Sequence, residues 1–489
     1  MVDSTHTHSP AVTAGGRTAR VAETIRGRIG ARGLAPGERL PSIRRLAGQM
    51  GVSPSTVVEA YDRLAAEGLI RARPGSGFYV CGPAAPLTLA DATPRRDRAI
   101  DPLWLSRQAL DAEPGVPMPG CGWLPAAWMP QGAIRRAMRG LARAEDGLLT
   151  DYGSTRGALD LRRLLERQFA GEGLAVPADQ ILLTASDTNA VDLIGRFLLR
   201  PGDTVLVDDP CYFNFQALLA VHGVRLLGVP YTPTGPDLAR FEAVLAEHRP
   251  RLYLTNSALQ NPTGASLSPQ TAHLVLTLAA AHDLTIVEDD IFADLEPEPS
   301  PRLAALDGLA RVIRIGSFSK TLSAAIRCGY IAARPDWLEA LADLQVATSF
   351  GGPSPISVEL VTGTLRDGSY RRHLDALHRR LSKARRETAA RLEPLGIVPW
   401  LMPRGGFQLW CALPHGLDAA DVARAALDEG LVLAPGNVFS LSGSASGFMR
   451  FNVAQMGDAR IFDGLARAMK AAQRRAPASA EIDLPPSVL

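Results

Sequence analysis

One lysine is the first candidate for chemistry in this sequence. Only three of the 52 basic residues are lysines, and Lys320 lies in the turn Ser317-Phe318-Ser319-Lys320, shortly after the apolar run 312–315. Arginine would supply charge equally well, so a retained lysine suggests a function that needs a primary amine, such as imine formation with a carbonyl. A solvated surface amine is the alternative. Lys383, in a charged helical run, and Lys470, near a polar tail, are typical of surface lysines.

The elements that must position Lys320 form an alternating pattern beyond Pro102. Short apolar runs, which predict strands, alternate with longer amphipathic segments: 181–184, 204–207, 252–254, 284–287 and 312–315. This alternation predicts an α/β fold with a mostly parallel sheet covered by helices.

Polar residues follow each predicted strand, where parallel sheets bind ligands. They are Asp187-Thr188 at the start of a helix, 208–212, 261–264, 288–290 and 317–320. Any one of these segments is typical of a turn. Five in succession favour a shared site at the carboxyl edge of the sheet.

Length and composition limit the class of protein. With 489 residues, 46% hydrophobic and 21% charged, the chain predicts a soluble protein of two or three domains. Its five cysteines are scattered without a C-x-x-C pair, so we expect reduced thiols, no disulfide framework and no metal site. Residues 1–16 lack an apolar segment, and no apolar run is long enough to span a bilayer. We expect a disordered start and a cytoplasmic location.

Residues 17–80 concentrate positive charge and predict a DNA-binding domain. The segment holds eleven arginines and five acidic residues. Ser42 is a predicted N-cap of a helix whose inner face is Leu46, Ala47 and Met50, and Ser53 with Pro54 caps another. The buried positions expected in that second helix are Val57, Tyr61 and Leu64. Two strands, 70–73 and 78–80, flank a turn at 74–77 and predict a wing carrying Arg71 and Arg73.

This segment resembles the GntR family of winged-helix repressors in the motifs Pro36-Gly37-Glu38-Arg39-Leu40-Pro41-Ser42, Leu46-Ala47, Gly51-Val52-Ser53 and Thr56-Val57. The resemblance implies DNA contacts from the following residues: Arg44, Ser53, Ser55, Thr56, Gly75 and Gly77. Pro54 and Val58 occupy positions where the family often carries arginine. We therefore expect hydroxyl groups to read the bases, with weaker guanine contacts. Residues 81–101 predict a linker.

Residues 115–475 resemble a fold-type I aminotransferase, a pyridoxal 5′-phosphate (PLP) enzyme. The resemblance implies that Lys320 holds the cofactor as an imine, that Asp289 keeps the pyridine nitrogen protonated, that Asn261 bonds the ring 3-hydroxyl, and that Tyr212 stacks on the ring. The implied phosphate donors are the backbone of Ser186, Asp187 and Thr188, the side chains of Ser317, Ser319 and Arg327, and Tyr152 from a second subunit.

The resemblance also makes Arg450, within the apolar run Phe448-Met449-Arg450-Phe451-Asn452, the clamp for the carboxylate of an amino acid. A surface arginine at a strand edge is the alternative. The family usually has a tyrosine hydroxyl at or near Phe292 or Ile291, and neither residue has one. We therefore expect slow turnover. A carboxylate beside a phosphate is unfavourable, so we expect the Asp187 side chain to turn away or bond locally.

The whole chain resembles the MocR subgroup of GntR regulators, an α+β winged helix-turn-helix domain fused to an aminotransferase-like α/β domain. The domains expected are a disordered start (1–16), the winged domain (17–80), the linker (81–101), the PLP domain (102–475, with a small subdomain from about 370) and a tail (476–489). The leading hypothesis is a homodimeric regulator that binds operator DNA and senses an amino compound or PLP. A true aminotransferase and a scaffold with an inactive site are the alternatives.

Overall fold

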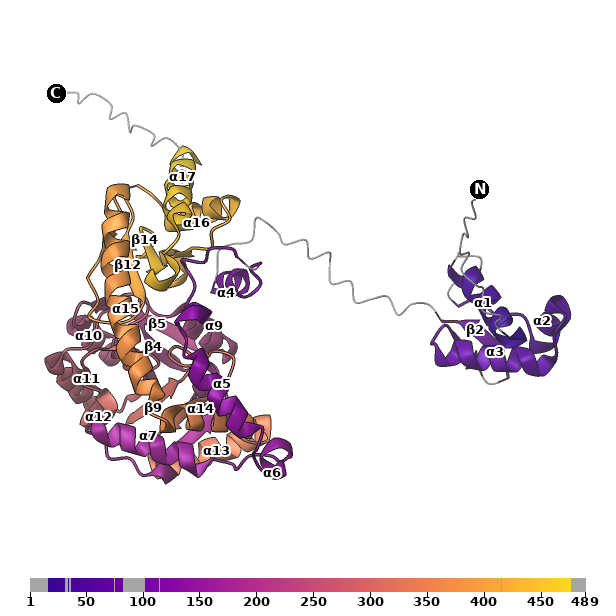
Figure 1. Cartoon of the computed structure of the whole chain (residues 1–489), viewed down its shortest axis with the longest axis horizontal. Coiled ribbons are helices and arrows are strands. Elements are labelled where there is room, and N and C mark those ends of the chain that lie inside the picture. The colour runs from indigo at the N-terminus through magenta and orange to yellow at the C-terminus, as the bar shows by residue number, and fades with distance from the viewer. Residues whose placement is uncertain are drawn as a thin grey trace, which may run out of the picture. The chain divides into compact units, whose positions relative to one another are not determined.

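The computed structural model divides the chain into two compact units, Met1–Arg98 and Ala99–Leu489 (Figure 1). The residues that it describes are 16–30, 34, 37–73, 75–81, 102–113, 115–414 and 416–475. The predicted disordered start, the linker at 81–101 and the tail lie, apart from residues 16 and 81, outside the described residues and remain predictions.

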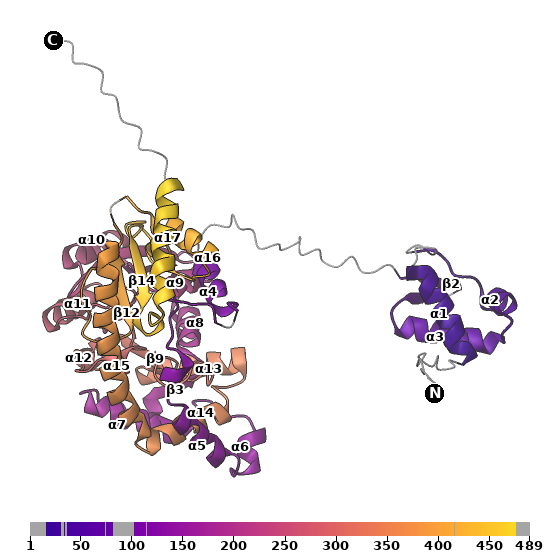
Figure 2. The same cartoon turned by 45° about the horizontal axis from the view of Figure 1, so that its top comes forward.

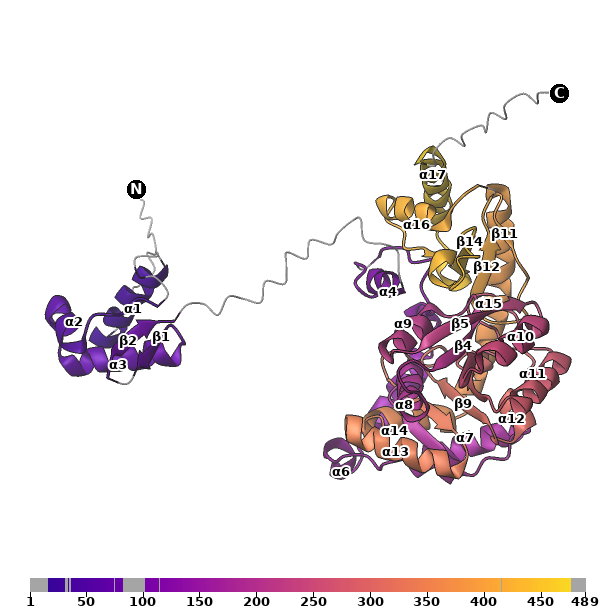
Figure 3. The same cartoon turned by 180° about the vertical axis from the view of Figure 1, so that it is seen from behind.

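The N-terminal unit is a three-helix winged fold, seen in Figure 2. Its elements are α1 (Arg17–Gly30), α2 (Ile43–Met50), α3 (Pro54–Ala66), β1 (Ile70–Arg73) and β2 (Gly77–Val80). The strands pair antiparallel, with Ile70 opposite Val80, and lie side by side in Figure 3. The predicted helix-turn-helix and wing are therefore present.

Local chemistry accounts for the boundaries of the two short helices. Ser42 accepts a hydrogen bond from the N–H of Arg45, and Ser53 accepts one from the N–H of Thr56, so both predicted N-caps are confirmed. Gly51 ends α2 at φ 63°, a left-handed conformation that glycine adopts without strain. Each of the three positions expected in the core of α3 has no exposed surface: Val57, Tyr61 and Leu64.

The C-terminal unit is built on an eight-stranded sheet in the order β3-β10-β9-β8-β7-β4-β5-β6. Its strands are β3 (Ile181–Thr184), β4 (Thr204–Asp209), β5 (Arg225–Thr232), β6 (Gly235–Pro236), β7 (Leu252–Thr255), β8 (Thr285–Asp289), β9 (Val312–Ser317) and β10 (Gly329–Ala332). Strands β5, β4, β7, β8 and β9 run parallel, while β10 runs antiparallel to both of its neighbours. The mostly parallel sheet predicted from the sequence is confirmed.

Helices cover both faces of this sheet (Figures 1 and 3). One face packs against α7 (Leu159–Gly171), α10 (Leu238–His248), α11 (Pro269–Ala281), α12 (Leu303–Asp307) and α14 (Pro355–Arg366). The other packs against α8 (Asp187–Leu198), α9 (Phe213–Val221) and α13 (Pro335–Ser349). Successive residues of a strand reach opposite faces; Leu206 packs in the first core, while Val205 and Val207 pack in the second.

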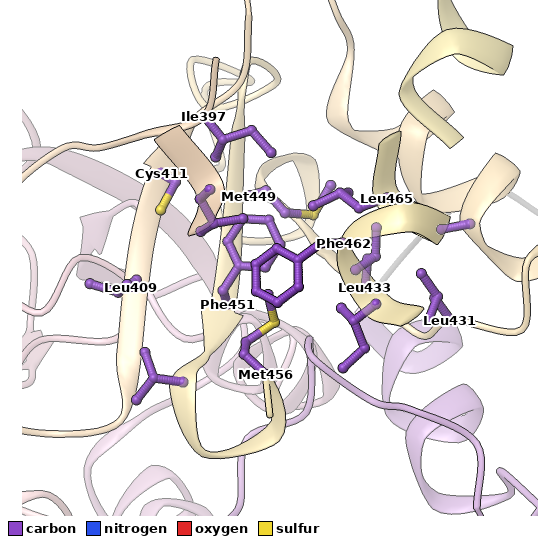
Figure 4. Packing of buried hydrophobic residues seen from close by; sticks show 14 of the residues in the cluster. Ile397, Leu409, Cys411, Leu431, Leu433, Met449, Phe451, Met456, Phe462 and Leu465 are labelled. Atoms are coloured by element: carbon purple, nitrogen blue, oxygen red, sulfur yellow. The ribbon is translucent and has the colours of Figure 1, made fainter. Parts of the chain in front are cut away.

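A second sheet, with the order β11-β12-β14-β13, forms the C-terminal part of this unit. Its strands are β11 (Val398–Pro399), β12 (Gln408–Ala412), β13 (Ala434–Pro435) and β14 (Phe448–Asn452), and its helices are α15 (Ser369–Leu392), α16 (Ala419–Asp428) and α17 (Ala459–Arg475). Figure 4 shows its core, where Met449 and Phe451 of β14 meet Phe462 and Leu465 of α17. All four side chains are buried.

A segment from the start of this unit is attached to the last strands of the chain. The N–H of Gly120 donates to the Val432 carbonyl (2.9 Å), and the N–H of Asn452 donates to the Pro119 carbonyl (2.7 Å). A Cβ at Gly120 would lie 2.3 Å from the backbone nitrogen of Ala434, so this approach requires glycine. Before α7, the chain of this unit also forms α4 (Pro102–Leu110), α5 (Gln131–Leu141) and α6 (Asp146–Thr150).

Charged side chains are also buried beside the sheet, which the sequence analysis did not predict. Arg314 of β9 has no exposed surface and contacts Asp290 at 2.5 Å, and Arg302 contacts Asp290 at 2.8 Å and Glu296 at 2.9 Å. Each of these four charged groups therefore has an opposite charge, which offsets the cost of removing it from water. Within the described ranges, no helix is both long and apolar enough to cross a membrane.

Candidate functional site

Lys320 follows the carboxyl end of β9 and lies at the centre of the candidate site. Its ammonium nitrogen Nζ donates to the carbonyl oxygen of Gly122 at 2.7 Å. Burial and the nearby positive charge of Arg450 lower the pKa of Lys320 to about 8. The side chain thus lies within the protein and is more easily deprotonated than a surface lysine, as a nucleophilic amine requires.

Asp289, the last residue of β8, faces the same site. Its Oδ2 accepts a hydrogen bond from Asn256 Nδ2 at 2.7 Å, and its Oδ1 accepts one from the N–H of Ile291 at 3.0 Å. Burial raises the pKa of Asp289 to about 7, partly opposed by these two bonds. The bonds fix the orientation of the carboxylate.

The amino terminus of α8 contributes backbone N–H groups. Ser186 caps the helix by accepting from the N–H of Asn189 at 3.0 Å, and the first N–H groups of a helix have no acceptor within it. The Asp187 side chain is buried, and burial together with Asp289 raises its pKa well above the ordinary value. Its Oδ1 atom has no hydrogen-bond partner among the described residues.

Three further predicted phosphate donors lie close to Lys320 along the chain: Ser317, Ser319 and Arg327. The hydroxyl oxygens of Ser317 and Ser319 are 2.8 Å apart, and the N–H of Ser319 donates to Ser317 Oγ at 3.1 Å. Arg327 adopts the left-handed conformation, with φ 54°. Ser317 is the last residue of β9, and Ser319 and Arg327 lie on the connection between β9 and β10.

Arg450 lies in β14 and is 1% exposed, so the alternative of a surface arginine is wrong. Its Nη1 donates to Asn261 Oδ1 at 2.8 Å, and its Nη2 donates to the Gly120 carbonyl at 2.7 Å. Its Nε is buried without a partner in the described part of the chain. Burial lowers the pKa of Arg450 to about 10, which still leaves the guanidinium charged at neutral pH.

The two tyrosines that are predicted to contact the cofactor, Tyr212 and Tyr152, differ in their surroundings. Tyr212 precedes α9 and contacts the ring of Phe215 at a centroid distance of 5.3 Å; burial raises its pKa to about 12. Tyr152 is 80% exposed and lies against Phe350, with ring centroids 4.9 Å apart. Within this single chain, Tyr152 therefore faces solvent.

Phe292 and Ile291, the positions at or near which the family usually has a tyrosine hydroxyl, differ in their environment. Phe292 is 4% exposed and packs edge-on against Phe407, with centroids 5.8 Å apart. Ile291 packs against the same C-terminal core and gives only its N–H to Asp289. Neither side chain can donate a hydrogen bond.

The candidate DNA-binding residues all lie in the N-terminal unit. Arg44 is exposed on α2, and Gly75 and Gly77 lie in the wing with φ 71° and 101°. Ser53 Oγ lies 2.8 Å from both the Ser55 Oγ and the Thr56 Oγ1 atoms. Ser53 therefore has a structural role as a cap, and its contact with DNA stays a prediction.

The donor set fits PLP. The site combines an amine of lowered pKa with a fixed carboxylate at Asp289, helix N–H groups and serine hydroxyls for a phosphate, and a buried guanidinium whose Nε lacks a partner. A Cβ at Gly122 would lie 3.9 Å from Lys320 Nζ, so glycine there keeps the space beside the amine open. The arrangement can bind a carbonyl compound that carries a phosphate, together with a carboxylate.

Sequence reasoning missed two groups that position this site. Asn256 holds Asp289, and the Gly122 carbonyl holds Lys320. A signal for Asn256 existed, because it directly follows β7 at the same sheet edge. No local signal marked Gly122, which lies 198 positions before Lys320.

Comparisons with known proteins agree with this geometry. Residues 126–467 match the model for aminotransferase class I and II, and residues 17–80 match the model for bacterial regulatory proteins of the gntR family. The chain therefore belongs to the aminotransferase class I and II family and carries a gntR-family domain, the combination found in GntR regulators of the MocR type.

The similar proteins include both transcriptional regulators and transaminases. An uncharacterised HTH-type transcriptional regulator of Escherichia coli, YdcR, is 30% identical over 452 residues, covering 89% of this chain and 94% of that protein. A 2-aminoadipate transaminase of Thermus thermophilus is 30% identical over 367 residues, covering 73% of this chain and 90% of that protein. A crystal structure of α-aminoadipate aminotransferase from Thermus thermophilus, complexed with N-(5′-phosphopyridoxyl)-L-leucine, matches with a TM-score of 0.68 at 27% identity, covering 76% of this chain and 94% of that one.

Proposed function

We propose that the chain is a PLP-dependent transcriptional regulator that binds DNA through its N-terminal unit and senses an amino compound through the Lys320 site. One observation carries the proposal: the chain that contains a winged helix also contains a partly buried amine facing a fixed carboxylate and a buried guanidinium. The two family matches support both halves.

In this proposal the cofactor supplies an aldehyde and a ring that accepts electrons, and the protein positions it. Lys320 would hold the aldehyde carbon, and Asp289, whose carboxylate is held by Asn256, would face the ring nitrogen. The N–H groups at the start of α8, together with Ser317, Ser319 and Arg327, would donate to the phosphate. Asn261 and Tyr212 would contact the ring.

Arg450 binds the carboxylate of the amino compound. Its guanidinium is already oriented by Asn261 and by the Gly120 carbonyl, so little conformational entropy is lost when a carboxylate binds. The buried Nε supplies an N–H that has no protein acceptor among the described residues. This feature favours an amino acid over a simple amine as the ligand.

A second copy of the chain completes the proposal. Tyr152 and Phe350 are 80% and 67% exposed and contact each other at the surface. Paired exposed aromatic side chains favour burial against a partner. We assign Tyr152 to the phosphate of the partner subunit's cofactor in a homodimer.

A true aminotransferase is the second candidate, favoured by the 30% identity to a 2-aminoadipate transaminase. The two functions are separated by measuring both outputs on one preparation. Full-length protein loaded with PLP is given a panel of amino donors and keto acids, and its turnover and its affinity for a selected DNA duplex are measured at the same ligand concentrations. We expect a change in DNA affinity with slow turnover. Turnover above ~1 per second with DNA affinity unmoved by any ligand would make the protein an aminotransferase.

A further inference from the structure

The exposed face of α3 carries one large apolar side chain. Val58 is 39% exposed, whereas the other apolar side chains of its middle turns have no exposed surface: Val57, Ala60, Tyr61 and Leu64. Ser55 and Asp62, three residues before and four after Val58, are exposed neighbours along the same face. Val58 is therefore not part of the core of this unit.

The hydroxyl groups beside Val58 are bonded to one another. Ser53 Oγ accepts from the N–H of Thr56 at 3.3 Å and lies 2.8 Å from the hydroxyl oxygens of both Ser55 and Thr56. Reading a base with Ser53 would compete with the cap that begins α3. Hydroxyl groups alone are therefore an incomplete basis for sequence recognition by this helix.

Charged side chains on α3 and directly after it form ion pairs. Arg63 contacts Glu59 at 2.7 Å, and Thr18 Oγ1 donates to the same glutamate at 3.1 Å. Glu67, just after the helix, contacts Arg26 at 2.9 Å. These side chains are directed at one another along α1 and α3.

Further exposed arginines lie on other elements of the unit. Arg44 and Arg45 are exposed in the first turn of α2, and Arg71 and Arg73 are exposed on β1. Positive side chains on α2 and the wing suit the phosphates on either side of a groove. The face of α3 that carries Val58 is left to meet the base edges.

We propose that Val58 contacts the C5-methyl group of a thymine in the major groove and makes thymine a preferred base at that position of the site. The proposal rests on the proposed DNA-binding function. In helix-turn-helix proteins, residues in the amino-terminal half of the second helix meet the base edges, and Val58 is the fifth residue of α3. Thymine alone presents a methyl group in the major groove, and an apolar side chain contacts it favourably.

The test uses full-length protein loaded with PLP. The protein first selects binding sites from a randomised duplex library at fixed salt, and the selected site is then synthesised with each thymine replaced in turn by uracil. Uracil lacks only the C5-methyl group. At one or more positions we expect uracil to weaken binding of the unaltered protein about three- to ten-fold, the effect of losing one buried methyl contact.

Two substitutions then assign the effect to Val58. In Val58→Ala the uracil penalty should fall to near one-fold at the same position, while Val58→Ile should retain it. Asp62→Ala is the matched control on the same exposed face; it should strengthen binding to all duplexes by removing a negative charge and leave the uracil penalty unchanged. Alanine favours helix more than valine does, so loss of α3 is not the expected result of Val58→Ala.

Several results would overturn the inference. A uracil penalty that is equal in Val58→Ala and the unaltered protein, or no uracil penalty at any position, would remove the thymine contact. A change in oligomeric state on Val58→Ala, with all duplexes weakened alike, would instead make Val58 a protein contact. Failure to enrich any sequence would refute sequence-specific binding and hence the proposed function itself.

Discussion

Replacement of Arg450 by alanine tests how the site selects its ligand. In the proposed role, the guanidinium forms charge-assisted hydrogen bonds with the ligand carboxylate, and such bonds contribute about 1.5–3 kcal/mol. Arg450 is 1% exposed, so water screens this interaction little. At 1.4 kcal/mol per tenfold, Arg450→Ala should weaken binding of an amino acid about 10- to 150-fold.

The assay compares two ligands that differ by a carboxylate, L-alanine and ethylamine, by titration of the absorbance of bound PLP. Only the binding of L-alanine should weaken. Arg385→Ala is the matched control, because Arg385 is also a buried guanidinium that donates to backbone carbonyls, at Arg404 and Gly406. It should lower the melting temperature without changing the ratio of the two affinities. Equal weakening for both ligands in Arg450→Ala would show that Arg450 only supports the fold.

Lys320 and Arg44 give three further predictions. Lys320→Ala should abolish the borohydride-reducible link to PLP. The control Lys383→Ala, which changes an exposed lysine 3.6 Å from Glu387, should retain this link. Peptide mapping that finds the pyridoxyl group on Lys383 would contradict the assignment. The neutral amine of Lys320 is the nucleophile, and its pKa is about 8. The rate of PLP attachment to cofactor-free protein should therefore rise with pH and level off above about pH 8. A rate that continues to rise up to pH 10 would contradict the lowered pKa. Arg44→Ala should weaken binding to any DNA duplex and make the salt dependence less steep, which a titration at several salt concentrations measures; an unchanged slope would exclude a phosphate contact.

Features set by local chemistry were predictable from the sequence. The caps at Ser42 and Ser53 follow from side chains that bond the backbone within three residues. The strands of the large sheet follow from short apolar runs, and Lys320 was found because its type is rare in this chain. Such features depend on neighbours along the chain.

Contacts between distant segments were not predictable in this way. Arg314 was visible inside an apolar run, but its pairing with Asp290 depends on the register of β8 and β9 and on the loop beyond β8. Gly122 approaches Lys320 only because its segment is attached to the second sheet. A single sequence contains no signal for these pairings, because each one depends on the completed topology.

The attachment of residues 117–123 to the last strands also has a consequence for protein synthesis. The Asn452 side chain donates to the carbonyls of Cys121 and Trp123, and the N–H of Val432 donates to that of Pro117. At a translation rate of about 5–20 residues per second, Asn452 leaves the ribosome roughly 20–70 seconds after the winged unit, whose core ends at Val80. A nascent or prematurely terminated chain can therefore fold the winged unit before the Lys320 site exists. Under the proposed function, such chains would occupy DNA during that interval without responding to a ligand.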